Sequence, residues 1–196
     1  MPRVSQQYKD DQRAQILEAA RRCFVRNGFH RTSMQDVFTE SGRSAGAVYR
    51  YFPKKEDMIV AVAAQNLDDV AGVLRAVVAN RGGTLGLGEV MARLLEAVTQ
   101  RHADRQLAAM ALMVWSEALR NPTLAERLRE AITTMTGDVA DLIRQRQRAG
   151  ELTGASAEAL AHAILTILPG FLFQMALLGT AGVADVPDAV RALWPN

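Results

Sequence analysis

Residues 15–59, QILEAARRCFVRNGFHRTSMQDVFTESGRSAGAVYRYFPKKEDMI, decide the fold. Their apolar residues recur at helical spacing, and the second and third runs are separated by a short polar turn that contains Gly42. Ser33 and Ser44 stand at positions typical of helix N-caps, and Asp36 completes a capping-box-like pattern with Ser33. The stretch therefore predicts three helices, of which the last two are short and joined by a tight turn.

Two short helices joined by a tight glycine-containing turn form a helix-turn-helix. The exposed positions of its second helix are small or polar, and such residues let a helix end enter the major groove of DNA. Tyrosine hydroxyls and lysine ammonium groups follow, and both contact phosphates. This pattern predicts that DNA is bound by Ser44, Ala45, Gly46, Ala47, Tyr49, Tyr51, Lys54 and Lys55.

The net charge of +2 hides an asymmetry along the chain. Residues 1–55 hold eleven Lys and Arg against five Asp and Glu, whereas residues 56–196 hold twelve against sixteen. A basic N-terminal quarter on an acidic remainder indicates a module that faces an anion. Nucleic acid is the obvious anion, and a solvated basic face is the alternative.

The N-terminal stretch resembles the DNA-binding domain of TetR-family transcriptional regulators. The matching motifs are Ile16-Leu17, Ala20, Phe24, Gly28-Phe29, Thr32-Ser33, Ser44-x-Gly46-x-x-Tyr49-x-Tyr51-Phe52 and Lys55-Glu56. The resemblance implies a helix-turn-helix domain over residues 1–53 and a helical effector-binding and dimerisation domain over residues 54–196. It also implies a dimeric, ligand-responsive repressor that binds a palindromic operator without a cofactor.

Residue roles follow from the same resemblance. Ser33 corresponds to a phosphate-contacting helix cap, and Gln35 corresponds to an outward residue that reaches a base. Ser44 to Ala47 correspond to the recognition face, and Tyr49, Tyr51 and Lys55 to contacts with the DNA backbone. Two positions depart from the family pattern. Phe38 replaces the usual alanine and predicts a repacked core, whereas Arg43 replaces an apolar residue and is either an added DNA contact or a solvated side chain.

Helical spacing continues through the rest of the chain, and the alternating pattern of strands is absent. The sequence therefore predicts an all-α protein of about nine helices. After residue 53 we expect helices over residues 54–79, 89–101, 104–119, 122–149, 156–178 and 186–194, with Asn121 as a cap before Pro122.

The C-terminal part offers an effector site. Residues 108–115 are apolar on all sides, which predicts a central helix, and methionines adapt to varied apolar ligands. Ordinary core packing is the alternative for each residue. The expected effector is small and mostly apolar or aromatic, and the candidate residues are Met91, Met110, Met113, Trp115, Met135, His162, Phe171 and Met175.

Residues 159–184 contain no charged side chain. Their length permits a membrane span, which keeps open a helical membrane-associated or interaction protein. A helix buried in a core or a subunit interface is the simpler interpretation, because polar residues and Pro169-Gly170 interrupt the run. We expect a homodimer formed by the last two helices, with Phe171 and Leu178 at the interface, and no membrane. The polar N-terminus and the single cysteine predict a cytoplasmic protein.

Three patterns could have indicated catalysis or cofactor binding. Residues 42–46 satisfy G-x-S-x-G, the nucleophile elbow of α/β-hydrolases, but that motif needs a preceding strand and TSMQDVFTE predicts a helix. The glycines of residues 81–88 do not follow the order of a dinucleotide-binding loop. The three histidines fit no metal-ligand spacing. We therefore expect neither a metal nor an enzyme.

Overall fold

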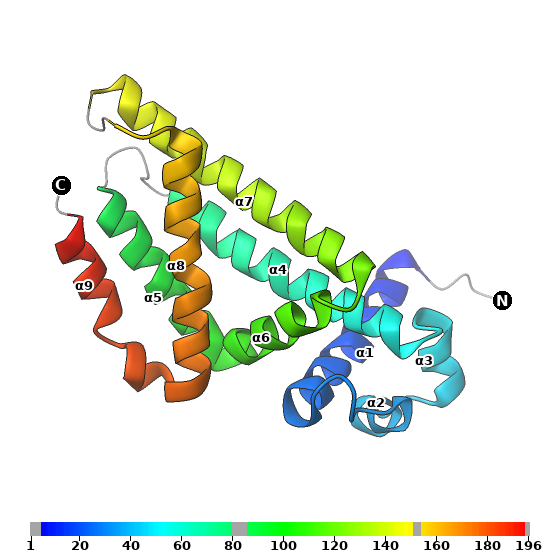
Figure 1. The fold of residues 1–196 in the computed structure, drawn as a ribbon. Coiled ribbons are helices and arrows are strands. Elements are labelled where there is room, and N and C mark those ends of the chain that lie inside the picture. The colour runs from blue at the N-terminus through cyan, green and yellow to red at the C-terminus, as the bar shows by residue number, and fades with distance from the viewer. Residues whose placement is uncertain (1–4, 80–85, 151–153, 195–196) are drawn as a thin grey trace. The chain divides into compact units, whose positions relative to one another are not determined.

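The computed structural model describes residues 5–79, 86–150 and 154–194. Every regular element in these residues is helical, so the prediction of an all-α protein is confirmed (Figure 1). The nine α-helices and one 3-10 helix of the described residues are α1 (Gln6–Asn27), α2 (Met34–Ser41), α3 (Ala45–Tyr51), α4 (Lys55–Ala79), α5 (Leu87–Arg105), α6 (Leu107–Ala118), α7 (Pro122–Arg148), α8 (Ala157–Leu178), η1 (Thr180–Val183) and α9 (Val186–Leu193).

Three predicted N-caps are formed, whereas α1 begins earlier than expected, at Gln6 after the cap Ser5. The side chains of Ser33, Ser44 and Asn121 each accept a hydrogen bond from a backbone N–H of the following turn, as N-caps do. The boundary between α5 and α6 lies later than predicted. It falls at Gln106, which has a φ of 49° and ends α5 in a left-handed conformation without the usual glycine.

The chain divides into two compact units, residues 1–65 and 66–196. The division falls inside α4 rather than after residue 53. The reason is packing, since Met58, Ile59 and Val62 in the first turns of α4 are buried in the N-terminal unit. One continuous helix therefore contributes to both hydrophobic cores.

The core of the N-terminal unit contains Phe24, Phe29 and Phe52 among mostly aliphatic side chains. Phe24 and Phe29 meet edge to face at 5.0 Å, and the guanidinium of Arg13 lies over the ring of Phe52 at 5.0 Å. Val37 of α2 and Val48 of α3 are fully buried, so each short helix is fixed by its inner face. The opposite faces of α2 and α3 are left outward.

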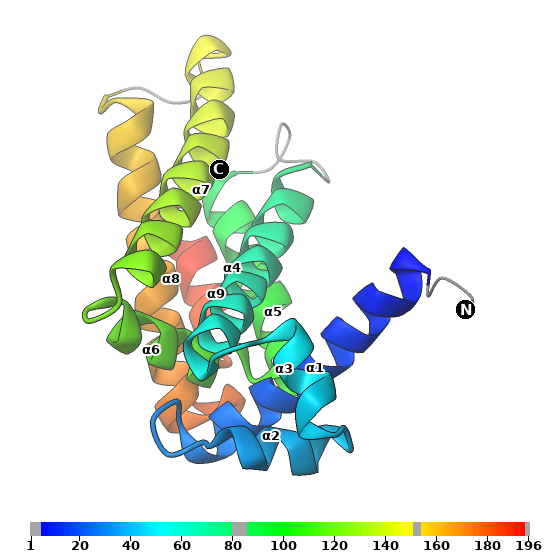
Figure 2. The same cartoon turned by 90° about the vertical axis from the view of Figure 1, so that its right-hand side faces the viewer.

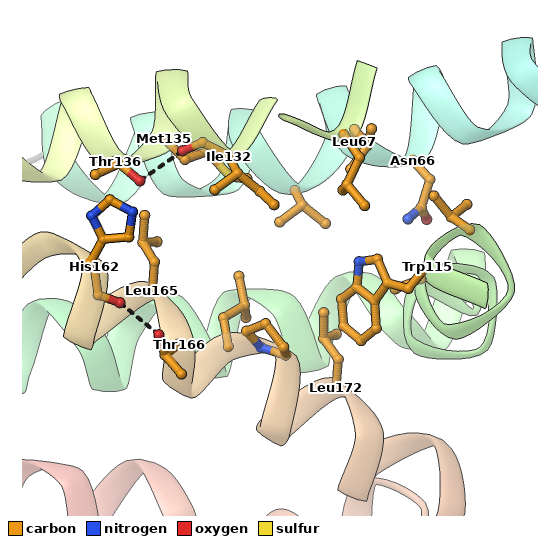
Figure 3. A pocket seen from close by; sticks show the side chains of 16 residues that line it. Asn66, Leu67, Trp115, Ile132, Met135, Thr136, His162, Leu165, Thr166 and Leu172 are labelled. Atoms are coloured by element: carbon orange, nitrogen blue, oxygen red, sulfur yellow. Dashed lines mark hydrogen bonds between the residues drawn. The ribbon is translucent and has the colours of Figure 1, made fainter. Parts of the chain in front are cut away.

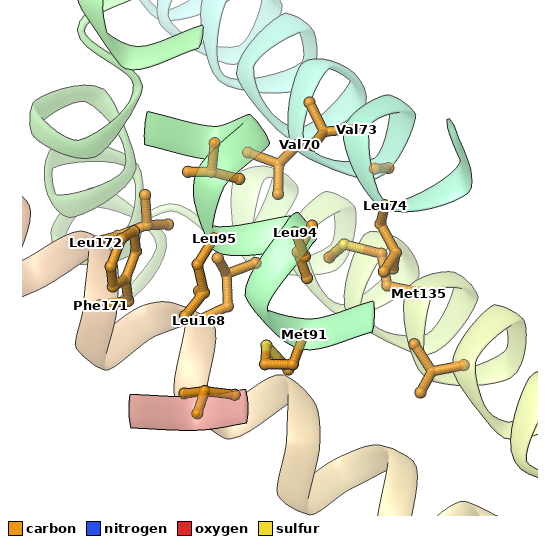
Figure 4. Packing of buried hydrophobic residues seen from close by; sticks show 14 of the residues in the cluster. Val70, Val73, Leu74, Met91, Leu94, Leu95, Met135, Leu168, Phe171 and Leu172 are labelled. Atoms are coloured by element: carbon orange, nitrogen blue, oxygen red, sulfur yellow. The ribbon is translucent and has the colours of Figure 1, made fainter. Parts of the chain in front are cut away.

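The core of the C-terminal unit is built from α4 to α9 and is mostly aliphatic (Figure 4). Helix α8 packs against α6 and α7, while α9 packs along α5 (Figure 2). Arg191 of α9 bridges Glu89 at 2.6 Å and Glu96 at 2.7 Å on α5. Gly88 allows this close approach, because a Cβ atom there would lie 2.6 Å from the carbonyl oxygen of Trp194.

Helix α8 is long and apolar enough to cross a membrane, the only helix among the described residues of which this is true. Only 28% of its most apolar segment is buried in this chain. Phe173, Leu177 and Leu178 are exposed, whereas Phe171 is 4% exposed and packs in the core of its own chain. The prediction of Phe171 as an interface residue is therefore wrong, because the helix phase turns it inward.

Candidate functional site

The capping box before α2 is formed as the sequence predicts. The backbone N–H of Ser33 donates to Asp36 Oδ2 at 2.8 Å, and the N–H of Asp36 donates to Ser33 Oγ at 3.2 Å. Hydrogen bonds from the backbone and hydroxyl of Ser33 lower the pKa of the Asp36 carboxyl. This box fixes the N-terminus of α2 and leaves Ser33 and Gln35 exposed.

The turn between α2 and α3 depends on Gly42. Its φ of 64° is left-handed, and its N–H bonds the carbonyls of Phe38 and Thr39 at the end of α2. Arg43 follows and donates through a guanidinium nitrogen to Gln15 Oε1 at 2.7 Å. The arginine that departs from the family pattern thus ties the turn to α1.

The N-terminal end of α3 presents small side chains. Ala45 and Gly46 are exposed and Ala47 is half-buried, while Ser44 Oγ accepts from the N–H of Ala47 at 3.3 Å. A Cβ atom on Gly46 would meet nothing within 4 Å. Because alanine stabilises a helix by about 0.5–1 kcal/mol relative to glycine, the fold itself does not require glycine at this position.

The side chain of Tyr49 is half-exposed and packs on α2. Its ring meets that of Phe38 edge to face at 5.4 Å. Phe38 is half-buried and forms an aromatic contact between α2 and α3. The pair holds Tyr49 at the edge of the α3 face, and Tyr51 is half-buried on the same helix.

Lys54 and Lys55 have different surroundings. Lys54 is exposed, with no hydrogen bond or ion pair to any described residue. Lys55 is half-buried, and its Nζ donates to the carbonyls of Thr32 at 3.0 Å and His30 at 3.3 Å. An ammonium group has three N–H donors, so one donor of Lys55 is left for another partner.

Ion pairs between α1 and α2 neutralise the Glu40 carboxylate. Arg22 and Arg26 contact Glu40 at 2.7 and 3.1 Å, and these hydrogen bonds lower the pKa of the Glu40 carboxyl. Arg31 and Arg50 are exposed and form no ion pair with any described residue. Arg31 was not among the predicted residues, although its place just before the Ser33 cap was a usable signal.

The G-x-S-x-G motif has no elbow geometry. Ser44 follows helix α2 and a glycine turn rather than a strand, and its hydroxyl caps α3. Within the described ranges no three His, Cys, Asp or Glu side chains gather in a way that could hold a metal ion.

The C-terminal unit contains a cavity of about 250 Å³ (Figure 3). Its walls come from α4, α6, α7 and α8, and exposed wall residues on α7 and α8 mark its opening. The wall consists of Asn66, Leu67, Val70, Ala111, Val114, Trp115, Leu128, Ile132, Met135, Thr136, His162, Leu165, Thr166, Leu168, Pro169 and Leu172.

Three of the predicted effector residues, Trp115, Met135 and His162, line this cavity. The other five lie off its wall because helix phase, which spacing alone did not fix, turns them elsewhere: Met91, Met110, Phe171 and Met175 are buried, and Met113 is half-buried. Sequence reasoning missed the contribution of α4. Asn66 was its available signal, as an amide within an otherwise apolar helical run.

The chemistry of the cavity wall is almost wholly apolar, and none of its residues carries a formal charge when its histidine is neutral. The hydroxyls of Thr136 and Thr166 donate at 2.8 Å to the carbonyls of Ile132 and His162. The side chain of Asn66 is 4% exposed and forms no hydrogen bond with a described residue.

A three-helix unit with a helix-turn-helix, joined to a helical unit with an apolar cavity, defines the class of helix-turn-helix transcriptional regulators. Two family models match the chain: that of bacterial regulatory proteins of the tetR family over residues 16–62, and that of the C-terminal domain of BetI-type transcriptional repressors over residues 88–194. The chain belongs to the TetR family of transcriptional regulators.

Individual relatives agree along nearly the whole length. The transcriptional regulator UidR of Escherichia coli K12 is 29% identical over 182 residues, covering 92% of this chain and 90% of UidR. The transcriptional repressor AcnR of Corynebacterium diphtheriae is 28% identical over 202 residues, covering 100% of both chains. The solved structure of Salmonella enterica GusR has a TM-score of 0.74 and 25% identity, covering 97% of each chain.

Proposed function

We propose that this regulator is a homodimeric repressor that binds a palindromic operator through α2 and α3. A small, uncharged and mostly apolar effector, bound in the cavity of the C-terminal unit, releases it from DNA. The protein acts by binding alone. Effector and operator favour different arrangements of the two N-terminal units, so that each weakens the binding of the other.

The observation that carries the DNA-binding role is the α3 face. Ala45 and Gly46 are exposed, and a Cβ atom on Gly46 would meet nothing within 4 Å. The chain nevertheless has glycine at this helical position, where alanine would make the helix more stable. Close approach of another molecule explains that choice. Around this face the cations of Arg31, Arg50 and Lys54 supply phosphate contacts, and Gln35 reaches a base.

Helix α4 supports the coupling between ligand and DNA. Met58, Ile59 and Val62 lie in the core of the N-terminal unit, whereas Asn66 and Leu67 of the same helix line the cavity. A ligand that displaces the cavity part of α4 thereby acts on a helix that the DNA-binding unit contains. No separate hinge or loop has to transmit the change.

The homodimer rests on α8 and α9. Five large apolar side chains would be exposed to water in a monomer. They are Phe173, Leu177 and Leu178 of α8, Leu193 of α9, and Trp194 directly after α9. A second copy covers them through a two-fold axis, and the two N-terminal units then meet half-sites related by the same axis. A membrane-bound form would instead place the α8 side chains in lipid.

The substitution Gly46→Ala tests the DNA-binding role, because two measured quantities should move in opposite directions. We expect the unfolding free energy to rise by about 0.5–1 kcal/mol, while binding to an operator selected from random duplexes weakens at least about tenfold. Gly137→Ala is the matched control, since Gly137 is an exposed helical glycine of α7 where an added Cβ atom would likewise meet nothing within 4 Å.

The control variant should gain stability and keep its operator affinity. If Gly46→Ala also keeps its operator affinity, α3 does not approach DNA closely. If the protein selects no sequence from random duplexes, the proposed function itself is wrong.

A further inference from the structure

The end of the cavity away from its opening carries two polar groups that have no hydrogen-bond partner among the described residues. Figure 3 shows Asn66 and Trp115 at one end, with the amide and the indole nitrogen directed into the space between them. Neither side chain forms a hydrogen bond with any described residue. The Asn66 side chain is 4% exposed and Trp115 is half-buried, but their polar atoms are not among the enclosed atoms without a partner, so they reach the cavity surface. Amides and indole N–H groups in an apolar site ordinarily have partners. Two such groups at one place indicate that a ligand supplies the missing partner.

The opposite end of the cavity is chemically different. His162, Thr136 and Thr166 lie there, and both threonine hydroxyls already donate to carbonyls of their own helices. His162 Nδ1 lies 3.3 Å from the carbonyl of Glu158, and the ring is exposed. These groups already have hydrogen-bond partners or are exposed to water, so they do not require a polar group of the ligand at this end. Between the two ends the wall is aliphatic.

We infer that the cavity binds an uncharged ligand with an apolar body and one carbonyl or hydroxyl oxygen, which accepts hydrogen bonds from the Asn66 amide and the Trp115 indole N–H. This inference deepens the proposed function, since the cavity is the proposed effector site. The oxygen lies at the end away from the opening and the apolar body extends toward α7 and α8. A free carboxylate or ammonium group is disfavoured, because no residue of the wall offers a fixed opposite charge.

The size of the cavity sets the size of the ligand body. An apolar cavity of about 150 Å³ holds benzene. A cavity of about 250 Å³ therefore suits a body of about ten carbon atoms, such as two fused aromatic rings. Larger ligands would extend through the opening beside Ile132 and Pro169, which are exposed wall residues.

Three probes of nearly equal shape separate the effect of the neutral oxygen from the effects of the apolar body and of charge. They are 2-acetylnaphthalene, 2-isopropenylnaphthalene and 2-naphthoate. The first has the neutral oxygen, the second replaces it with a CH2 group, and the third carries a negative charge. Calorimetry on the full chain without DNA, at pH 8, gives their affinities. We expect the acetyl compound to bind about tenfold more tightly than the isopropenyl compound and at least about 100-fold more tightly than the naphthoate.

Two variants test the named residues. Asn66→Leu removes the amide at similar volume, and Trp115→Phe removes the N–H while keeping an aromatic ring. Each should reduce the preference for acetyl over isopropenyl to less than about threefold. Gln100→Leu, an exposed amide on α5, is the control and should leave the preference unchanged.

The inference is overturned if wild-type protein binds the acetyl and isopropenyl compounds equally, if the naphthoate binds best, or if none of the three binds. It is also overturned if both cavity variants keep the full preference. Failure of the proposed function would give a different set of results. In that case the preference is intact, but the acetyl compound leaves operator binding unchanged or no operator exists.

Discussion

Replacing Lys55 by methionine tests two roles of its side chain, contact with a DNA phosphate and stabilisation of the N-terminal unit. The sequence predicts a phosphate contact, whereas the structure shows the ammonium group bonded to the carbonyls of Thr32 and His30. Hydrogen bonds to a charged group contribute about 1.5–3 kcal/mol when shielded from water. Because Lys55 is half-buried and His30 is exposed, we take about 2 kcal/mol for the pair together.

Lys54→Met is the matched comparison, since it removes the same charge from the neighbouring residue without a carbonyl contact. Both substitutions should lower the slope of operator affinity against salt by about one. Only Lys55→Met should destabilise the N-terminal unit. Hydrogen exchange of amides in α1 to α3 measures this directly, and about 2 kcal/mol corresponds to roughly a 30-fold loss of protection.

Two results would refute this reasoning. If Lys55→Met changes protection by less than about threefold, the carbonyl contacts contribute nothing to stability in solution. If it destabilises the unit but leaves the salt slope unchanged, the third N–H of Lys55 does not reach a phosphate, and only Lys54 remains as the lysine contact.

Two further predictions concern the C-terminal unit. Leu177→Glu should convert the dimer to a monomer in sedimentation at micromolar protein, whereas Leu119→Glu, at an 87% exposed leucine outside α8 and α9, should not; an intact dimer in both would exclude this interface. Burial lowers the pKa of His102, whose Nδ1 accepts from the N–H of Ala108 at 3.2 Å, so below about pH 6.5 the unfolded chain binds a proton that the folded chain does not. Thermal stability followed by tryptophan emission should therefore fall as pH decreases through this window, and less so in His102→Gln; an identical pH dependence in both proteins would exclude His102 as its cause.

The elements of this fold that sequence predicts well are those with local causes. The N-caps Ser33, Ser44 and Asn121 each begin a helix through contacts within one turn, so their side chains suffice to place these boundaries. Gln106 illustrates the opposite case. It adopts the left-handed conformation that glycine favours, and nothing in its own chemistry marks it as the end of α5.

The cavity was harder to predict because its wall depends on which face of each helix turns inward. Met110 and Trp115 lie on the same short helix, yet only Trp115 reaches the wall. The apolar residues of α4 look like core residues in the sequence, and Leu67 and Val70 serve as both core and wall. The composition predicted an apolar site, but it did not predict that the amide of Asn66 lies within it.

The outward tip of α3 has a consequence for how such regulators diversify. Because Ala45 and Gly46 hold no part of the fold together, new side chains there are tolerated by the scaffold. Under the proposed function, a duplicated gene could move to a different set of promoters through one or two codon changes at this tip. Its response to the same small molecule would be inherited unchanged, so that a single chemical signal comes to govern a second set of genes.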